Sequence, residues 1–232
     1  MDRFVAYIDI LGFKDLVETN THGHVLKKLK RLKQSLDEID KREKQDLRTW
    51  IFSDSIFIFS MDDTYEAADA VMINTAKVVE SALRSGLLVK GAVAHGKITA
   101  DFQRSIFFGR PLIDAYLLQE EMKLASVVLH HTCEHKILSY DHKAPIDGSG
   151  RCLEYPTPFV GGVVNHMHLN WLEYLILYRI DKEDDKTAEM DRHIERLRDL
   201  YLTVSGHPRV YIDNTLKFFD ECRRLVTPGA NS

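Results

Sequence analysis

The sequence predicts an α+β fold, because strand-like and helix-like apolar patterns alternate over its first ninety residues. Three segments are rich in β-branched and aromatic residues, which favour buried strands. Apolar residues at helical spacing fill the stretches between them. The expected elements, in order, are strand 4–8, helix 25–47, strands 48–52 and 55–60, helix 64–83 and strand 87–94. Strand, helix, strand, strand, helix, strand is the ferredoxin-like βαββαβ arrangement.

Polar turns bound the strands of this core. The apolar run 4–8 is interrupted by Asp9, and Gly12 permits the tight turn that follows. Ser53 and Asp54 separate two apolar runs, which is the spacing of a tight hairpin.

Capping signals bound the helices. Val25, Leu29 and Leu32 begin an apolar stripe, and the lysine-rich opposite face is typical of a solvated helix. Thr64 offers an N-cap for the second helix, and Ser85-Gly86 ends it.

Beyond residue 100 the pattern adds short strands and many helical residues. The expected elements are strand 105–108, helix 111–124, strand 127–129, loops over 138–159, and helices at 166–179, 184–204 and 209–226. We therefore expect a catalytic domain over residues 1–164. A helical extension over 165–232 would pack on that core or on a second subunit.

Composition excludes several classes of protein. The 232 residues are 44% hydrophobic, too apolar for a disordered chain. A net charge of −4 gives no basic field for binding nucleic acid. No apolar run approaches the ~20 residues of a membrane span, and the immediate first strand leaves no room for a signal peptide. The odd number of widely spaced cysteines (Cys133, Cys152 and Cys222) indicates a cytoplasmic protein without a disulfide framework.

Asp9 and Asp54 are the strongest candidate site residues. In a ferredoxin-like sheet the first strand lies beside the hairpin, so the end of that strand and the hairpin turn share one edge. Two carboxylates there suit a divalent metal such as Mg²⁺, and the amides of Leu11, Gly12 and Phe13 could hold phosphate. The alternative is that Asp9 merely forms a turn and Asp54 merely occupies a hairpin tip.

Lys90 and Trp50 are the next candidates. Lys90 lies inside an apolar strand and requires an anion, either a triphosphate or a neighbouring carboxylate. Trp50 begins the strand that leads to Asp54; it could stack on a base, although composition alone favours a core position. The dense group His130, His131, Cys133 and His135 lacks the spacing of a zinc site, and we do not expect His166 or His168 to be ligands.

These residues resemble the motifs of class III nucleotide cyclases. Tyr7-Ile-Asp9-Ile-Leu-Gly12-Phe13 is similar to their opening Phe-x-Asp-Ile-x-Gly-Phe, and Phe52-Ser53-Asp54-Ser55 to their Ile-Gly-Asp hairpin. Lys90 falls where these enzymes carry an arginine, and Phe108-Gly109 before a helix with Ala115 loosely matches a later motif. The resemblance covers about residues 4–130.

The resemblance implies a catalytic site made of Asp9, Asp54 and Lys90. Asp9, Asp54 and the carbonyl of Ile10 would hold two Mg²⁺ or Mn²⁺ ions. Leu11, Gly12, Phe13 and Lys90 would bind the triphosphate. The enzyme would be a homodimer with its sites at the interface.

Trp50 points to the substrate within this family. Purine cyclases carry a base-reading residue at this position, and their second reader would fall near Ile106. A bulky aromatic leaves room for a smaller base, which resembles the pyrimidine cyclases of the bacterial Pycsar antiphage systems. This implies a uridylate cyclase that makes cyclic UMP from UTP as an antiphage signal.

Two positions depart from the family. Its transition-state asparagine and arginine would fall near Ile113 and Leu117, which cannot replace them chemically. The possible replacements are Arg110, Asp114 and Arg104. The alternatives are a cytidylate cyclase, a catalytically silent nucleotide-binding module, and a polymerase-like enzyme that makes linear products.

Overall fold

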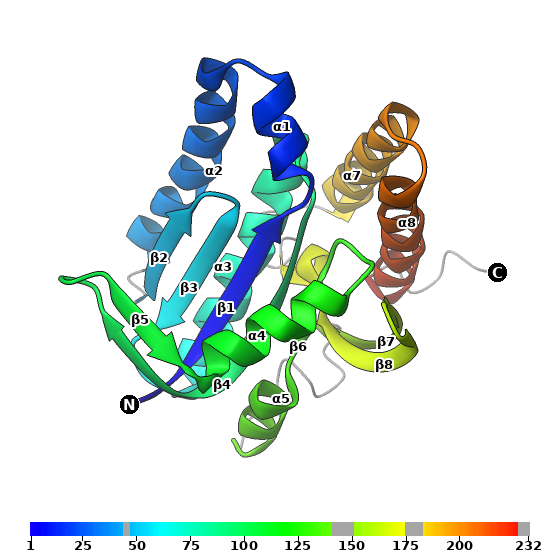
Figure 1. Cartoon of the computed structure of the whole chain (residues 1–232). Coiled ribbons are helices and arrows are strands. Elements are labelled where there is room, and N and C mark those ends of the chain that lie inside the picture. The colour runs from blue at the N-terminus through cyan, green and yellow to red at the C-terminus, as the bar shows by residue number, and fades with distance from the viewer. Residues whose placement is uncertain (44–46, 141–150, 175–182, 227–232) are drawn as a thin grey trace.

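A computed structural model describes residues 1–43, 47–140, 151–174 and 183–226, and it has the expected α+β architecture (Figure 1). The strands are β1 (Asp2–Ile10), β2 (Leu47–Phe52), β3 (Ser55–Ser60), β4 (Val89–Asp101), β5 (Ile106–Gly109), β6 (Val127–Leu129), β7 (Cys152–Phe159) and β8 (Gly162–Leu169). The helices are α1 (Phe13–Thr19), α2 (His22–Glu43), α3 (Tyr65–Arg84), α4 (Arg110–Glu121), α5 (His131–Leu138), α7 (Glu183–Thr203) and α8 (His207–Val226).

One sheet organises these elements. Its strand order is β2-β3-β1-β4-β6-β8-β7, and β5 pairs with β4 beside this path. The segment β2-β3-β1-β4 is the ferredoxin-like order, which confirms the predicted fold class. In the described segments, no helix is long and apolar enough to cross a membrane.

The main core lies on one face of the sheet. Alternate β1 residues Phe4, Ala6, Ile8 and Ile10 are buried there, as a strand period of two requires. Helix α3 is buried along nearly its whole length against this face. Its predicted cap is present, because the Thr64 side chain accepts a hydrogen bond from the Ala67 amide.

The opposite face is only partly covered. Helix α4 lies across β1 and β4 (Figure 1), and the β4–β5 hairpin folds over the other end of these strands. A second, smaller apolar cluster forms under this hairpin around Val5, Phe59 and Ile98. Between α4 and the β2–β3 hairpin, the face carries the residues of the candidate site.

Two expectations about the second half of the chain are wrong. Residues 152–159 were expected to be loop, yet they form β7; Pro156 and Pro158 are tolerated because β7 is an edge strand. The first residues of the helix expected over 166–179 instead belong to β8, which pairs with β7 in register. Residues 171–174 are helical as expected, and residues 175–179 lie outside the described part of the chain. The expected boundary at residue 164 therefore falls inside a strand, and residues 165–169 belong to the sheet.

The C-terminal helices follow the sequence prediction more closely. Helices α7 and α8 match the expected 184–204 and 209–226 within two residues at each end. Phe218 of α8 is fully buried against Tyr155 and His168 at the far end of the sheet. The tail is therefore packed on the core of its own chain.

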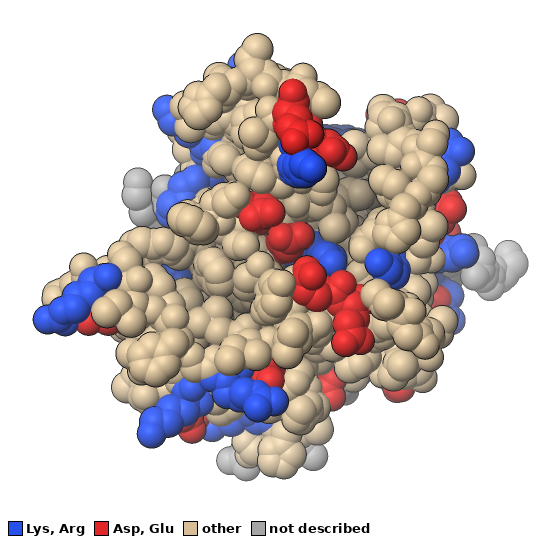
Figure 2. Space-filling view, viewed as in Figure 1, with Lys and Arg blue, Asp and Glu red and all other residues tan. Residues whose placement is uncertain are grey.

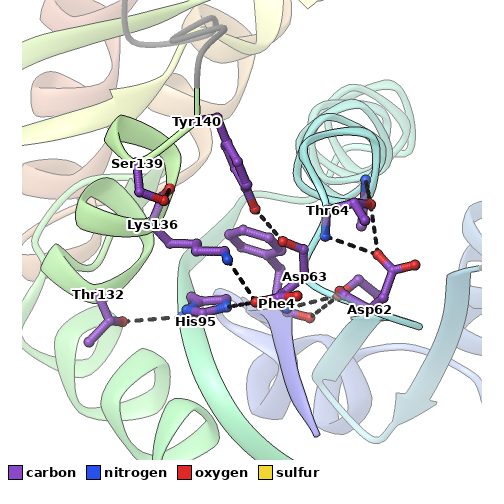
Figure 3. Close-up of polar contacts among 11 residues, drawn as sticks. Phe4, Asp62, Asp63, Thr64, His95, Thr132, Lys136, Ser139 and Tyr140 are labelled. Carbon is purple, nitrogen blue, oxygen red and sulfur yellow. Dashed lines mark hydrogen bonds and ion pairs between the residues drawn. The ribbon is translucent and has the colours of Figure 1, made fainter.

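A polar cluster holds α5 against the start of α3 (Figure 3). The Asp63 carboxylate lies 2.7 Å from the Lys136 ammonium and 3.5 Å from His95 Nε2. The Tyr140 hydroxyl donates to the Asp63 carbonyl. The hydrogen bond from Lys136 lowers the pKa of Asp63. This network lies beside Phe4 at the beginning of β1, at the opposite end of that strand from Asp9.

Candidate active site

The structure brings Asp9 and Asp54 close together at the end of the sheet where β1 finishes and β2 turns into β3. Asp9 pairs with Ser55 across β1 and β3, next to Asp54 in the turn. The Ile10 amide donates to the Asp54 carbonyl over 2.9 Å, which ties the end of β1 to the hairpin turn. The placement follows directly from the ferredoxin-like topology.

Backbone geometry explains the shape of this turn. Ser53 has a φ of 57°, in the left-handed region that favours glycine. A serine in this conformation costs conformational energy. In the similar Ile-Gly-Asp hairpin of class III cyclases, glycine occupies this position. The strained residue directly precedes Asp54 in the turn.

Asp9 carries an unfavourable charge. Burial, followed by repulsion from Asp54, raises the pKa of Asp9 to about 6, with Lys90 acting in the opposite direction. Among the described residues, none donates a hydrogen bond to its carboxylate. The half-buried Asp9 carboxylate lies beside a second carboxylate, and the charge of Lys90 offsets only part of the resulting electrostatic cost. Such an arrangement fits a binding site for a cation.

Few protein ligands are available for such a cation. Across the described ranges, no group of three or more His, Cys, Asp or Glu side chains could hold a metal ion. Two carboxylates and a main-chain oxygen are nevertheless enough for Mg²⁺, which usually keeps water and substrate oxygens in its shell. The donor set at Asp9, Asp54 and Ile10 therefore fits Mg²⁺ or Mn²⁺ bound together with a phosphorylated substrate.

Lys90 of β4 lies directly opposite Asp9 of the neighbouring strand β1. Its residue is only 5% exposed, and its ammonium donates to the Glu120 carbonyl at 3.3 Å. Burial lowers the pKa of Lys90, opposed by the negative charges of Glu120 and Asp9. Lys90 thus links the candidate metal site to the C-terminal end of α4.

Two residues near Lys90 were missed by the sequence analysis. Glu120, in the last turn of α4, acts electrostatically on both Asp9 and Lys90. The ring of Tyr211, on α8, lies 5.8 Å from the Lys90 ammonium. The acidic end of the predicted helix could have suggested Glu120. No local pattern indicates Tyr211, because its place depends on how the tail packs.

The turn after β1 offers two of the three expected amides. Gly12 has a φ of 69°, which turns the chain into α1. The Leu11 amide already donates to the Leu88 carbonyl at 2.9 Å, so Leu11 has no amide to offer a ligand. The amides of Gly12 and Phe13 make no hydrogen bond to any residue that the structure describes.

Trp50 lies on the same face of the sheet as Asp9. It pairs with Phe57, which pairs with Tyr7, two residues before Asp9. Because side chains alternate between faces, Trp50, Phe57, Tyr7 and Asp9 share one side. Trp50 is 37% exposed and contacts Phe107 with ring centroids 5.4 Å apart, so it is neither fully core nor fully free.

The possible replacements for the transition-state residues do not join this site within one chain. Arg110 lies ten residues before Glu120, about 15 Å along α4. It pairs with Asp114 over 2.6 Å. Arg104 pairs with Asp101 near the tip of the projecting β4–β5 hairpin (Figure 1).

Several exposed apolar side chains lie around the open face, and they are called the apolar patch. It comprises Phe52, Phe108, Ile113, Tyr116 and Leu117, each more than 40% exposed. Ile113 and Leu117 lie near the positions at which class III cyclases carry asparagine and arginine. Exposed apolar patches of this kind mark interaction surfaces. Figure 2 shows acidic and basic side chains gathered at the centre of this face, with uncharged surface beside them.

Solved structures with the same fold are cyclase domains. A double mutant of the guanylyl cyclase domain of the RhoGC fusion protein from the aquatic fungus Blastocladiella emersonii gives a TM-score of 0.55 at 14% identity, covering 72% of this chain and 94% of that chain. The guanylate cyclase domain of RhGC from Catenaria anguillulae, in complex with GTP, gives 0.52 at 13% identity, covering 72% and 95%. A bacterial light-regulated adenylyl cyclase gives 0.51 at 12% identity, covering 83% and 97%.

These likenesses define the class of fold. The chain has the class III cyclase fold, and it covers nearly the full length of each of these domains. No protein-family model matches the sequence, and no curated protein matches it significantly. At 12–14% identity the resemblance concerns architecture, and the chemistry has to be argued from the site itself.

Proposed function

We propose that this protein is a nucleotide cyclase that converts UTP to 3′,5′-cyclic UMP and pyrophosphate. The observation that carries the proposal is the pair Asp9 and Asp54, with Lys90 directly across the strand, on a fold of cyclase domains. The neighbouring Gly12 turn leaves two amides for phosphate.

Asp9, Asp54 and the carbonyl of Ile10 would hold Mg²⁺ or Mn²⁺, two ions per site. When bound, these ions would neutralise triphosphate charge and favour ionisation of the ribose 3′-hydroxyl. The raised pKa of Asp9 supports this assignment, because a cation is what its carboxylate lacks.

The remaining groups would bind and orient the triphosphate. The amides of Gly12 and Phe13 point from the turn at the start of α1 and would donate to phosphate oxygens. Lys90 uses one of its three N–H groups on the Glu120 carbonyl, so its ammonium keeps two donors for phosphate. Positioning of this kind supplies most of the catalysis in phosphoryl transfer.

The reaction balances without a further reactant. The 3′-oxygen of UTP forms a bond to the α-phosphorus, and the bond from that phosphorus to the bridging oxygen of the β-phosphate breaks. The products are cyclic UMP, pyrophosphate and a proton.

Trp50 supports a pyrimidine substrate. Its indole extends the aromatic row of Tyr7 and Phe57 on the face that carries Asp9. A base stacked there would meet a large ring where purine cyclases read their base, which leaves less room for a purine. UTP is the favoured substrate and CTP, giving cyclic CMP, is the alternative.

A homodimer would complete the site. The exposed Phe108, Ile113 and Leu117 supply an apolar surface for a second copy. Arg110, Asp114 and Arg104 stand away from Asp9 in their own chain, so any transition-state role would require them to come from the partner.

The second candidate is a catalytically silent nucleotide-binding module. Ile113 and Leu117 favour it, because neither can donate a hydrogen bond to a transition state. Such a module would bind Mg-UTP and form no product.

A substrate panel tests the proposal. The protein is incubated with UTP, CTP, ATP or GTP and Mg²⁺ or Mn²⁺, and the products are identified by mass. Cyclic UMP as the main product supports the proposal; a purine product or linear oligonucleotides would contradict it. Binding of Mg-UTP without turnover would identify the silent module.

The proposed biological role is an antiphage second-messenger signal made in the cytoplasm. It rests on the resemblance to the pyrimidine cyclases. The test is cyclic UMP in phage-infected bacteria carrying the wild-type gene or its Asp54→Asn variant. A rise with the wild type alone would support the role, and no rise on infection would contradict it.

A further inference from the structure

A cavity of about 470 Å³ lies between the core and the C-terminal helices, beside the turn that follows β1. Its walls come from α1, the loop before β4, the end of α7 and the start of α8. Figure 2 shows the surface hollowed between α1 and the α7–α8 pair. This volume falls in the range of pockets that hold small organic molecules, roughly 300–1,000 Å³.

The walls of this cavity are mainly apolar. Leu16, Leu87 and Leu88 line it from the core, and Leu200, Val204 and Ile212 line it from the tail. A ligand that fills this space would therefore be held chiefly by burial of apolar surface.

Two solvent-exposed polar residues at the rim of the cavity are available to orient a ligand. The Asp15 carboxylate of α1 and the His207 imidazole of α8 both line it. Neither makes a hydrogen bond or an ion pair with any residue that the structure describes. Asp15 accepts hydrogen bonds only, so it suits a ligand whose polar end donates one.

The cavity touches the candidate active site at two points. Leu11 and Gly12, which form the turn after Asp9, are part of its wall. So is Tyr211, whose ring also lies 5.8 Å from the Lys90 ammonium and 5.6 Å from that of Lys123. A molecule in the cavity would contact both segments.

We propose that this cavity is a regulatory site for a small, largely apolar molecule with one hydrogen-bond-donating end. Its occupant holds the Leu11–Gly12 turn against Leu88 and the Tyr211 ring beside Lys90. The regulatory meaning rests on the proposed cyclase function, whereas binding and the ordering of the turn do not.

The test uses N-phenyl-1-naphthylamine, a neutral aromatic amine with one N–H whose fluorescence rises in apolar surroundings. It is titrated into wild-type protein and into Val204→Trp, which places a large ring in the cavity from a partly exposed position. A matched control is Leu26→Trp, in the separate cavity of about 310 Å³ between α1 and α2.

The expected result is a single binding event in the wild type, weakened at least tenfold by Val204→Trp and changed less than twofold by Leu26→Trp. Hydrogen exchange of a peptide covering residues 9–16 should slow when the amine is bound. The Leu11 and Leu16 amides in it donate to the carbonyls of Leu88 and Gly12.

Absence of binding, equal binding to Val204→Trp, or unchanged exchange of residues 9–16 would each overturn the proposal. These readouts need no nucleotide. Binding with slowed exchange but no product from any triphosphate would leave the cavity site standing and refute the cyclase. Formation of cyclic UMP without binding of the amine would support the cyclase and refute the cavity site.

Discussion

Replacing Asp9 with asparagine is expected to stabilise the metal-free protein at pH 8. In the folded chain the Asp9 carboxylate is half-buried, near Asp54, and receives no hydrogen bond from the described residues. Asparagine has nearly the same shape and no charge. The substitution would therefore remove an electrostatic cost that a purely structural turn residue would not carry.

The size of the effect follows from the pKa of Asp9. Burial and Asp54 raise it from 3.8 to about 6. A shift of about two units corresponds to roughly 3 kcal/mol at 1.36 kcal/mol per unit. Solvent screening of this partly exposed group reduces the estimate to about 1–2 kcal/mol.

The sign depends on pH. Between about pH 4 and 6 the folded state binds a proton at Asp9 more tightly than the unfolded chain does, so wild-type stability falls as pH rises through this window. Above it the full cost is present. The advantage of Asp9→Asn should accordingly appear at pH 8 and vanish near pH 4.

The assay is urea unfolding of the wild type and Asp9→Asn with EDTA at pH 4 and pH 8. Asp199→Asn, at an exposed position of α7, is the matched control and should change stability by less than about 0.5 kcal/mol. Adding Mg²⁺ with UTP should stabilise the wild type and not Asp9→Asn. A loss of stability in Asp9→Asn at pH 8 with EDTA would show that the Asp9 carboxylate carries no such electrostatic cost and would favour a turn-forming role.

Four further predictions concern other parts of the molecule. Ser53→Gly should raise the free energy of unfolding by up to about 1 kcal/mol, because φ at this position is 57°; lower stability in urea unfolding would contradict this. Burial lowers the pKa of His168 to about 3. The histidine binds a proton more readily in the unfolded chain, so the free energy of unfolding should fall as pH drops below about 6.5, and it should fall less in His168→Gln. Equal pH profiles of the two proteins in urea unfolding would contradict this prediction. Trp50→Lys should move the UTP-to-ATP ratio of kcat/KM toward ATP by at least tenfold, and an unchanged ratio would remove Trp50 from base selection. Phe108→Glu should weaken self-association at least tenfold in sedimentation, since it places a charge on a side chain that is 62% exposed within the apolar patch; unchanged association would exclude this surface as the dimer interface.

The first half of the fold could be predicted because its signals are local. Each strand of the β2-β3-β1-β4 segment has an apolar run, and α3 has both an N-cap and an apolar stripe. Once the order of elements is known, topology alone brings Asp9 beside Asp54. Correct prediction of the strands therefore also predicted that the two carboxylates lie close together.

Other features depend on tertiary contacts that no local pattern reports. Pro156 and Pro158 indicate loop by composition, and only the edge position of β7 makes a strand possible. The sequence places the Leu11 amide among the phosphate donors, but in the fold this amide donates its hydrogen bond to the Leu88 carbonyl. Tyr211 reaches Lys90 from more than a hundred residues away, through the packing of α8.

In the proposed reaction, Asp9 and Asp54 together support cyclisation of UTP. The most direct measurement is the mass of the product formed from UTP and Mg²⁺ by the wild type, Asp9→Asn and Asp54→Asn, with folding of each checked by circular dichroism. Cyclic UMP is expected from the wild type, with at least a hundredfold less from either folded variant. No cyclic UMP from the wild type, or undiminished product from both variants, would contradict it.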